Sequence, residues 1–141
     1  MKSSAAKIVA PIIFVTSLGI AFAGQMSLDQ NGTAETPPVM TKASGLATLD
    51  VDPTGVVSGG LKTTGIDGTA AHIHMGASGS SGPPIITLER AGKDQWMVPQ
   101  GAKLSTEQYV AYKKGNLYVN VHSKAHPGGE IRAQLTPSSG S

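Results

Sequence analysis

The sequence contains no cysteine, so neither a disulfide nor a thiolate metal ligand is available to the protein. Among the common ligands of transition metals, imidazole, carboxylate and thioether groups remain. Aromatic residues make up only 4% of the chain, and no basic stripe with interleaved aromatics is present, which excludes an ordinary nucleic-acid-binding surface. Neither a Ser-His-Asp order nor a carboxylate pair is present to indicate a hydrolase.

An excess of charge of one sign is also missing. The formal net charge of +2 comes from 11 basic and 9 acidic residues, and Lys2 and Lys7 account for the whole excess. Beyond these two lysines the chain is formally neutral, so its charge says little about partners.

The N-terminus has the pattern of a secretory signal. An apolar run without charges covers residues 8–22, and it ends in the small-x-small pattern at residues 21–23 that signal peptidases recognise. The run of about 15 residues is short for a membrane span. We therefore predict a signal peptide over residues 1–23, cleaved between Ala23 and Gly24, and a secreted or periplasmic protein without stable membrane insertion. An uncleaved N-terminal anchor is the alternative.

The rest of the chain divides into three parts. Residues 24–43 are polar, lack periodicity and contain two consecutive prolines, so we interpret them as a flexible leader. Residues 44–136 form the expected folded domain. Residues 137–141 are expected to form a disordered tail.

Alternation of apolar and polar residues dominates the expected domain, as in "GLATLDVD", "TAAHIHM" and "NLYVNVHS". The one helical pattern is "STEQYVAYKKG", in which Ser105 and Gln108 can form a capping box and Gly115 ends the helix. These signals predict an all-β protein: an antiparallel, Greek-key-like β-sandwich of about seven to eight strands with one short helix.

The four histidines fall in two segments, "AAHIHM" and "NVHSKAHPGG". Because side chains alternate along a strand, His72 and His74 share the face opposite the apolar residues of their strand. The same count places His122 on the polar face of its own strand. If the two strands are neighbours in one sheet, the three imidazoles can converge.

A His-x-His pair on a strand is a recurrent metal-binding arrangement, and a third imidazole from a neighbouring strand completes a set suited to copper, with zinc less favoured. His126 follows His122 in a turn, where it can supply a fourth ligand or a hydrogen bond to a ligand. The alternative is that His72, His74 and His122 merely solvate a polar sheet face.

Two charged residues lie on the same face in "EIRAQL". Arg132 is a fixed cation beside the histidines, so it is expected to attract a small anion and stabilise its charge, which would make it a catalytic residue. Glu130 is interpreted as an ordinary surface charge.

The segments "AAHIHMGASGSSGPPIITL" and "LSTEQYVAYKKGNLYVNVHSKAHPGGEIRAQL" together resemble the CHRD domain. This family is named from chordin and is widespread in exported microbial proteins. The resemblance covers residues 44–136. Many relatives have asparagine before the Pro-Gly-Gly turn, where this chain has His126. The resemblance to chordin's repeats also implies an alternative function for this chain, a structural or adhesive module in which the histidines are incidental.

A second similarity is to copper/zinc superoxide dismutases, which are also β-sandwiches. His72 and His74 match the copper-binding His-x-His of those enzymes, His122 matches a copper histidine at the end of a late strand, and Arg132 resembles the arginine that guides superoxide. The disulfide, the zinc loop and the bridging histidine are missing. The similarity therefore implies a copper-only, superoxide dismutase-like oxidoreductase. Non-catalytic copper or zinc binding or buffering is the alternative.

Overall fold

The computed structural model describes residues 4–6, 9–13 and 24–138 of the chain. The predicted signal peptide, residues 1–23, and the end of the predicted tail lie mostly outside the described residues. Within those ranges, no helix has the length and apolar character needed to cross a membrane.

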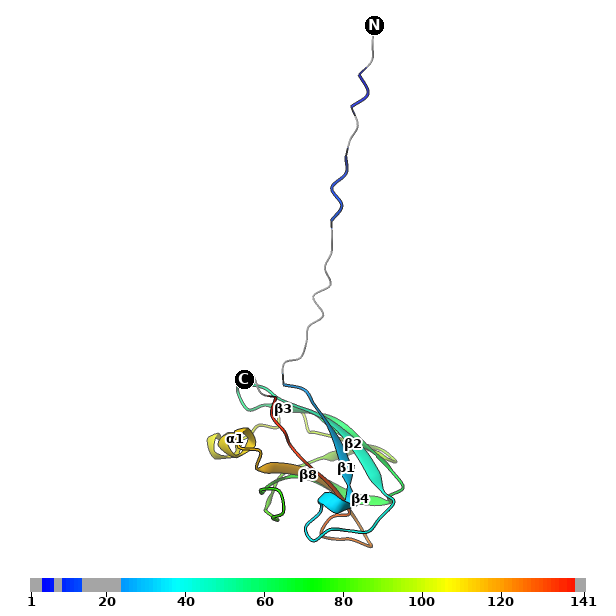
Figure 1. Cartoon of the computed structure of the whole chain (residues 1–141), viewed down its shortest axis with the longest axis vertical. Helices are drawn as coiled ribbons and strands as arrows, with labels where there is room; N and C mark the ends of the chain where they lie inside the picture. The colour runs from blue at the N-terminus through cyan, green and yellow to red at the C-terminus, as the bar shows by residue number, and fades with distance from the viewer. Residues whose placement is uncertain (1–3, 7–8, 14–23, 139–141) are drawn as a thin grey trace.

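Residues 24–138 form one folded unit of strands and short helices (Figure 1). A 3-10 helix, η1, covers Gly32–Ala34, and the α-helix α1 covers Thr106–Lys113. The nine strands are β1 (Met26–Asn31), β2 (Ser44–Val51), β3 (Val57–Thr64), β4 (Gly68–Met75), β5 (Pro84–Thr87), β6 (Glu89–Gly92), β7 (Gln95–Met97), β8 (Leu117–Ser123) and β9 (Ile131–Gln134).

All nine strands belong to one sheet, in the order β5-β4-β8-β9-β1-β2-β3-β7-β6, and every pairing is antiparallel. The two end strands, β5 and β6, are consecutive in the chain and separated only by Leu88. The sheet therefore curves round into a nearly closed, barrel-like shape (Figure 1). The all-β antiparallel class with one short α-helix is confirmed, although the strands exceed the expected seven to eight.

The prediction that residues 24–43 form a flexible leader is wrong for Met26–Asn31, which form β1. This strand pairs with β2 along its whole length and meets β9 where Asn31 lies opposite Arg132. Met26 and Leu28 point into the core, and so does the polar Gln30, which is buried. A polar residue at an inward position disguises the alternation, and this explains why the segment looks aperiodic in the sequence.

The core lies on one face of the sheet, as strand alternation predicts. In β4, β8 and the strand that follows the Pro-Gly-Gly turn, Met75 is partly buried against the core and the other apolar inward residues are buried: Ala71, Ile73, Leu117, Val119, Val121, Ile131, Ala133 and Leu135. Each large apolar side chain contributes on the order of 1.5–3 kcal/mol through burial. This packing fixes which side of β4 and β8 the histidines occupy.

The predicted helix is confirmed, including its cap. Ser105 Oγ accepts a hydrogen bond from Gln108 N at 3.2 Å, and Gln108 Oε1 accepts one from Ser105 N at 2.8 Å. Gly115 has a φ of +76°, which ends the helix two residues before β8 begins. Tyr112 is buried against the core and holds α1 at the side of the sheet (Figure 1).

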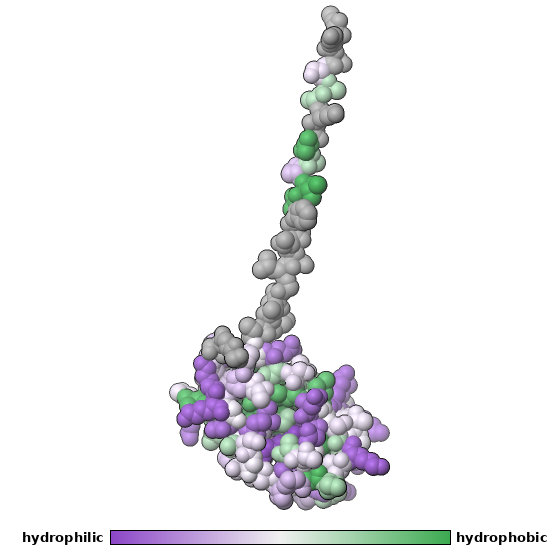
Figure 2. Space-filling model, viewed as in Figure 1, coloured by the Kyte–Doolittle hydropathy of each residue, from purple (hydrophilic) through white to green (hydrophobic). Residues whose placement is uncertain are grey.

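The face of β4, β8 and β9 that bears the histidines is covered by three connections, residues 32–43, 76–83 and 124–130, each of which forms a hydrogen bond with a side chain of that face. Ser81 Oγ donates to the Thr36 carbonyl at 3.4 Å, which joins the first two connections. The face is thus a second, polar interior rather than an open surface. The outside of the molecule shows intermixed hydrophilic and hydrophobic residues on the face drawn in Figure 2.

Candidate metal centre

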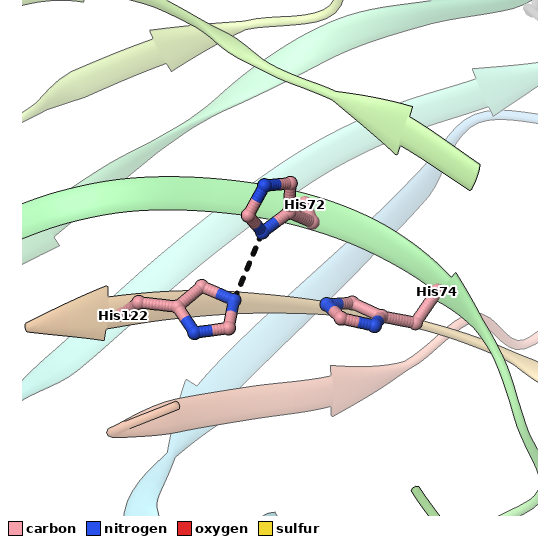
Figure 3. Close-up of side chains that lie close together, drawn as sticks. All are labelled: His72, His74 and His122. Carbon is pink, nitrogen blue, oxygen red and sulfur yellow. Dashed lines mark hydrogen bonds between the residues drawn. The ribbon is translucent and has the colours of Figure 1, made fainter. Parts of the chain in front are cut away.

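Three histidines meet on this covered face (Figure 3). His72 and His74 extend from β4 and His122 from β8, and one ring nitrogen of each lies within 4.8 Å of the others. His72 Nδ1 is 2.9 Å from His122 Nε2. The predicted convergence of these three imidazoles is confirmed.

The register of β4 against β8 brings them together. His72 lies opposite Asn120, His74 lies opposite Tyr118, and Ala70 lies opposite His122. His122 is therefore a diagonal neighbour of His72 on the same face of the sheet, within reach of a ring side chain. A slip of one residue in this register would place His122 on the core side and disperse the cluster.

Backbone carbonyls orient two of the three rings. His74 Nδ1 donates to the Gly82 carbonyl at 2.9 Å, and His122 Nδ1 donates to the Pro127 carbonyl at 2.8 Å. Each neutral ring then carries its proton on Nδ1 and its lone pair on Nε2. Fixing the far nitrogen of an imidazole in this way is the usual arrangement around histidines that bind metals.

The surroundings of His74 Nε2 indicate whether a metal ion fits this site. The residue is only 7% exposed, and within the part of the chain that the structure describes this nitrogen has no hydrogen-bond partner. A buried acceptor without a partner costs about 1–3 kcal/mol. A metal ion shared with His72 and His122 would satisfy it, and His72 is half-buried, which leaves an approach from solvent.

The electrostatics keep the imidazoles in the form that binds a metal. Burial lowers the pKa of His72 below 6.5, and the nearby His122 and His74 lower it further. Burial also lowers the pKa of His74, and a hydrogen bond to Gly82 only partly offsets this. The two rings are therefore held neutral near neutral pH, and metal ions bind neutral imidazole.

The metal-free protein should lose stability as the pH falls below about 6.5, because histidines of the unfolded chain then take up protons that His72 and His74 resist in the fold. Glu35 acts in the opposite direction, since burial raises its pKa from 4.5. Urea unfolding in the presence of a chelator, from pH 8 to pH 5, measures the effect. In a variant with both His72→Gln and His74→Gln, the free energy of unfolding should fall much less between pH 8 and pH 5. An equal fall in that variant would show that these two histidines do not cause the pH dependence.

Tyr118 supports His74, although nothing in the sequence marked it as functional. The two rings are stacked, with centroids 4.7 Å apart and an interplanar angle of 4°. Tyr118 Oη accepts a hydrogen bond from Gly82 N at 3.1 Å. The same glycine thus binds both His74 and Tyr118, and this fixes the orientation of the His74 ring.

Arg132 lies on the predicted face but is only 1% exposed. Its guanidinium lies 3.4 Å from the centre of the Tyr118 ring and donates to the carbonyls of Ala77 and Ser80, each at 2.9 Å, and to Gln134 Oε1 at 3.0 Å. These contacts occupy both terminal nitrogens of the guanidinium. An arginine that guides an anion would need those nitrogens free and close to solvent. The geometry instead gives Arg132 a positioning role: it holds residues 76–83 over the histidines.

His126 does not belong to the cluster of metal-ligand atoms found among the described residues. Its backbone N donates to Ser123 Oγ at 3.1 Å, and its carbonyl accepts from Gly129 N at 3.0 Å. These bonds shape the turn that presents the Pro127 carbonyl to His122. The supporting hydrogen bond comes from the backbone of the turn rather than from the His126 ring.

Glu130 is not the surface charge that the sequence suggested. It is only 7% exposed and accepts hydrogen bonds from Ser123 Oγ at 2.7 Å and Thr41 Oγ1 at 2.9 Å. The carboxylate ties the end of β8 to the connection before β2, which no local pattern could reveal.

A comparison with protein families identifies the family to which the chain belongs. The CHRD domain model matches residues 26–135, which includes β1, whereas the resemblance seen in the sequence began at residue 44. Searches among curated proteins and among solved structures returned no match. The match spans β1 to β9 and contains His72, His74 and His122. The chain belongs to the CHRD domain family.

Proposed function

We propose that this CHRD protein binds copper through His72, His74 and His122. The observation that carries the proposal is the buried His74 Nε2, which has no hydrogen-bond partner among the described residues and lies beside ring nitrogens of two other histidines. Three imidazoles suit copper, which binds nitrogen ligands more tightly than zinc does. Structural zinc sites usually have four protein ligands, so this cluster of three does not suit structural zinc, and a zinc ion bound here would need water or another ligand in its fourth position.

The activity we propose is that of a copper-only superoxide dismutase-like oxidoreductase. Bound copper would supply one-electron chemistry, taking an electron from one superoxide and returning it, with protons from solvent, to the next. The protein holds three nitrogens in place through Gly82, Pro127 and the Tyr118 ring. The half-buried His72 leaves an approach for a small anion. Non-catalytic binding or buffering of copper or zinc is the second candidate, because the donors of Arg132 are engaged by the protein itself.

Copper titration followed by a superoxide assay tests both steps. The chain from Gly24 onward, which contains every described strand, should bind one Cu(II) with a dissociation constant below the micromolar range. Absence of binding at micromolar copper would overturn the proposal. The copper-loaded protein should then consume superoxide in the presence of a chelator that silences free copper, and the zinc-loaded protein serves as the redox-inert control. If the two loaded forms are equally inactive, only metal binding remains.

We also propose that the protein acts outside the cytoplasm, because residues 1–23 have the charge, apolar run and cleavage pattern of a secretory signal. The intact mass of the protein recovered from the periplasm or medium should then correspond to a chain that begins at Gly24. A recovered chain that retains residues 1–23 would favour the uncleaved anchor instead.

A further inference from the structure

A second buried polar atom lies beside the three histidines. Asn120, on β8, occupies the same face as His122 and lies directly opposite His72 on β4. The residue is only 1% exposed. In the described part of the chain, its Oδ1 has no hydrogen-bond partner.

Glu35 fixes which way the Asn120 amide points. Asn120 Nδ2 donates to Glu35 Oε1 at 3.3 Å, so the amide oxygen faces away from that carboxyl group. Gly129 makes room for this contact: a Cβ there would come to 2.5 Å from Asn120 Nδ2 and 2.4 Å from Glu35 Oε1. The turn of the Pro-Gly-Gly motif thus permits the Glu35–Asn120 pair, and the pair orients Oδ1.

His74 Nε2 and Asn120 Oδ1 are two acceptors that cannot satisfy each other. The His74 proton is on Nδ1, where it is donated to Gly82, so Nε2 carries only a lone pair. Asn120 is also a diagonal neighbour of His74 on the same face of β4 and β8, because His74 lies opposite Tyr118. An ion at the three nitrogens, either alone or with a bound water, would satisfy both buried acceptors at once.

We infer that Asn120 is part of the metal centre and favours Cu(II) over Cu(I), because its Oδ1 contacts a divalent ion or the water bound to that ion. The inference rests on the proposed copper site and adds an oxygen contact to its three nitrogens. Oxygen ligands stabilise divalent ions, whereas Cu(I) prefers soft sulfur ligands. Asn120 therefore lowers the reduction potential of the bound copper.

Two substitutions with opposite expected effects test the inference. Asn120→Leu removes the oxygen at similar volume, and the Cu(II) affinity should fall by about tenfold with little change for Cu(I), since loss of a supporting partner typically costs 10–100-fold in metal affinity. A tenfold loss of Cu(II) affinity at constant Cu(I) affinity corresponds to a rise of about 59 mV in the one-electron reduction potential. Asn120→Asp places a charged oxygen at the same position and should lower the potential. Asn116→Leu, near the start of β8, is the matched control.

The readouts are Cu(II) and Cu(I) affinities, the reduction potential and the Cu(II) electron paramagnetic resonance spectrum. An unchanged potential and spectrum in both variants, or equal loss of both oxidation states, would overturn the role of Asn120 and leave copper binding intact. Failure of the unsubstituted chain to bind copper would overturn the proposed function itself.

A measurement on the unsubstituted protein covers the case in which neither variant folds. When Zn(II) is added to the isotopically labelled chain, the side-chain carbonyl ¹³C resonance of Asn120 should shift, while that of Asn116 stays in place. An unmoved Asn120 resonance in the zinc-loaded protein would overturn the inference.

Discussion

Replacing His74 with alanine should lower the copper affinity by more than about 100-fold, which exceeds the 10–100-fold typical for loss of a partner that only supports a ligand. The change removes the one cluster nitrogen that is buried and has no hydrogen-bond partner in the described ranges. His72 and His122 alone would leave two nitrogens that already contact each other at 2.9 Å. Competition with a chelator of known copper affinity measures the loss.

His126→Ala is the matched control, because it removes a histidine that lies outside the cluster of metal-ligand atoms found among the described residues. Its copper affinity should stay within about twofold of the unsubstituted protein, well below the effect of losing even a supporting partner. Equal losses in His74→Ala and His126→Ala would contradict the three-histidine assignment and restore His126 as a ligand.

Replacing Arg132 with methionine should lower the free energy of unfolding by about 2–4 kcal/mol, because hydrogen bonds to a charged group contribute roughly 1.5–3 kcal/mol each. The change deletes the bonds to Ala77, Ser80 and Gln134 and the contact with the Tyr118 ring. Removing a buried charge also removes its desolvation cost, which offsets part of the loss. Urea unfolding of the metal-free protein measures the difference.

Arg90→Met provides the comparison, since Arg90 is the other arginine and is exposed. Its guanidinium lies 4.2 Å from the Trp96 ring centre and donates to the Lys93 and Gly68 carbonyls. We expect a loss of about 1 kcal/mol or less at this exposed site. If Arg132→Met kept its stability but lost superoxide turnover, the anion-guiding role would be supported instead.

Local sequence signals predicted those parts of the fold that depend on neighbours in the chain. The Ser105–Gln108 capping box and the inward faces of β4, β8 and β9 follow from short-range geometry, and the structure confirms them. β1 was missed because its identity depends on pairing with β2 and β9, with the polar Gln30 pointing inward. Such pairing joins segments far apart in the chain and leaves a weak local pattern.

In the histidine site, too, local patterns predicted some features, and others depend on segments distant in the chain. Alternation was sufficient to place His72, His74 and His122 on one face of two strands. Alternation also placed Tyr118, Asn120 and Arg132 on this face, but it could not predict which residues they contact. Glu35 carried no signal, because it lies in a segment that looked unstructured and reaches Asn120 only in the folded chain.

The sequence by itself determined the class of fold, the short helix and the face on which the histidines lie, because strand and helix periodicities are local properties. Only the tertiary structure decided that β4 and β8 are neighbours in the required register, and that three connections cover the polar face. That cover turned Arg132 from an expected surface cation into a buried anchor. The physical reason is that alternation defines the direction of a side chain, whereas burial and hydrogen-bond partners depend on distant segments that pack against it.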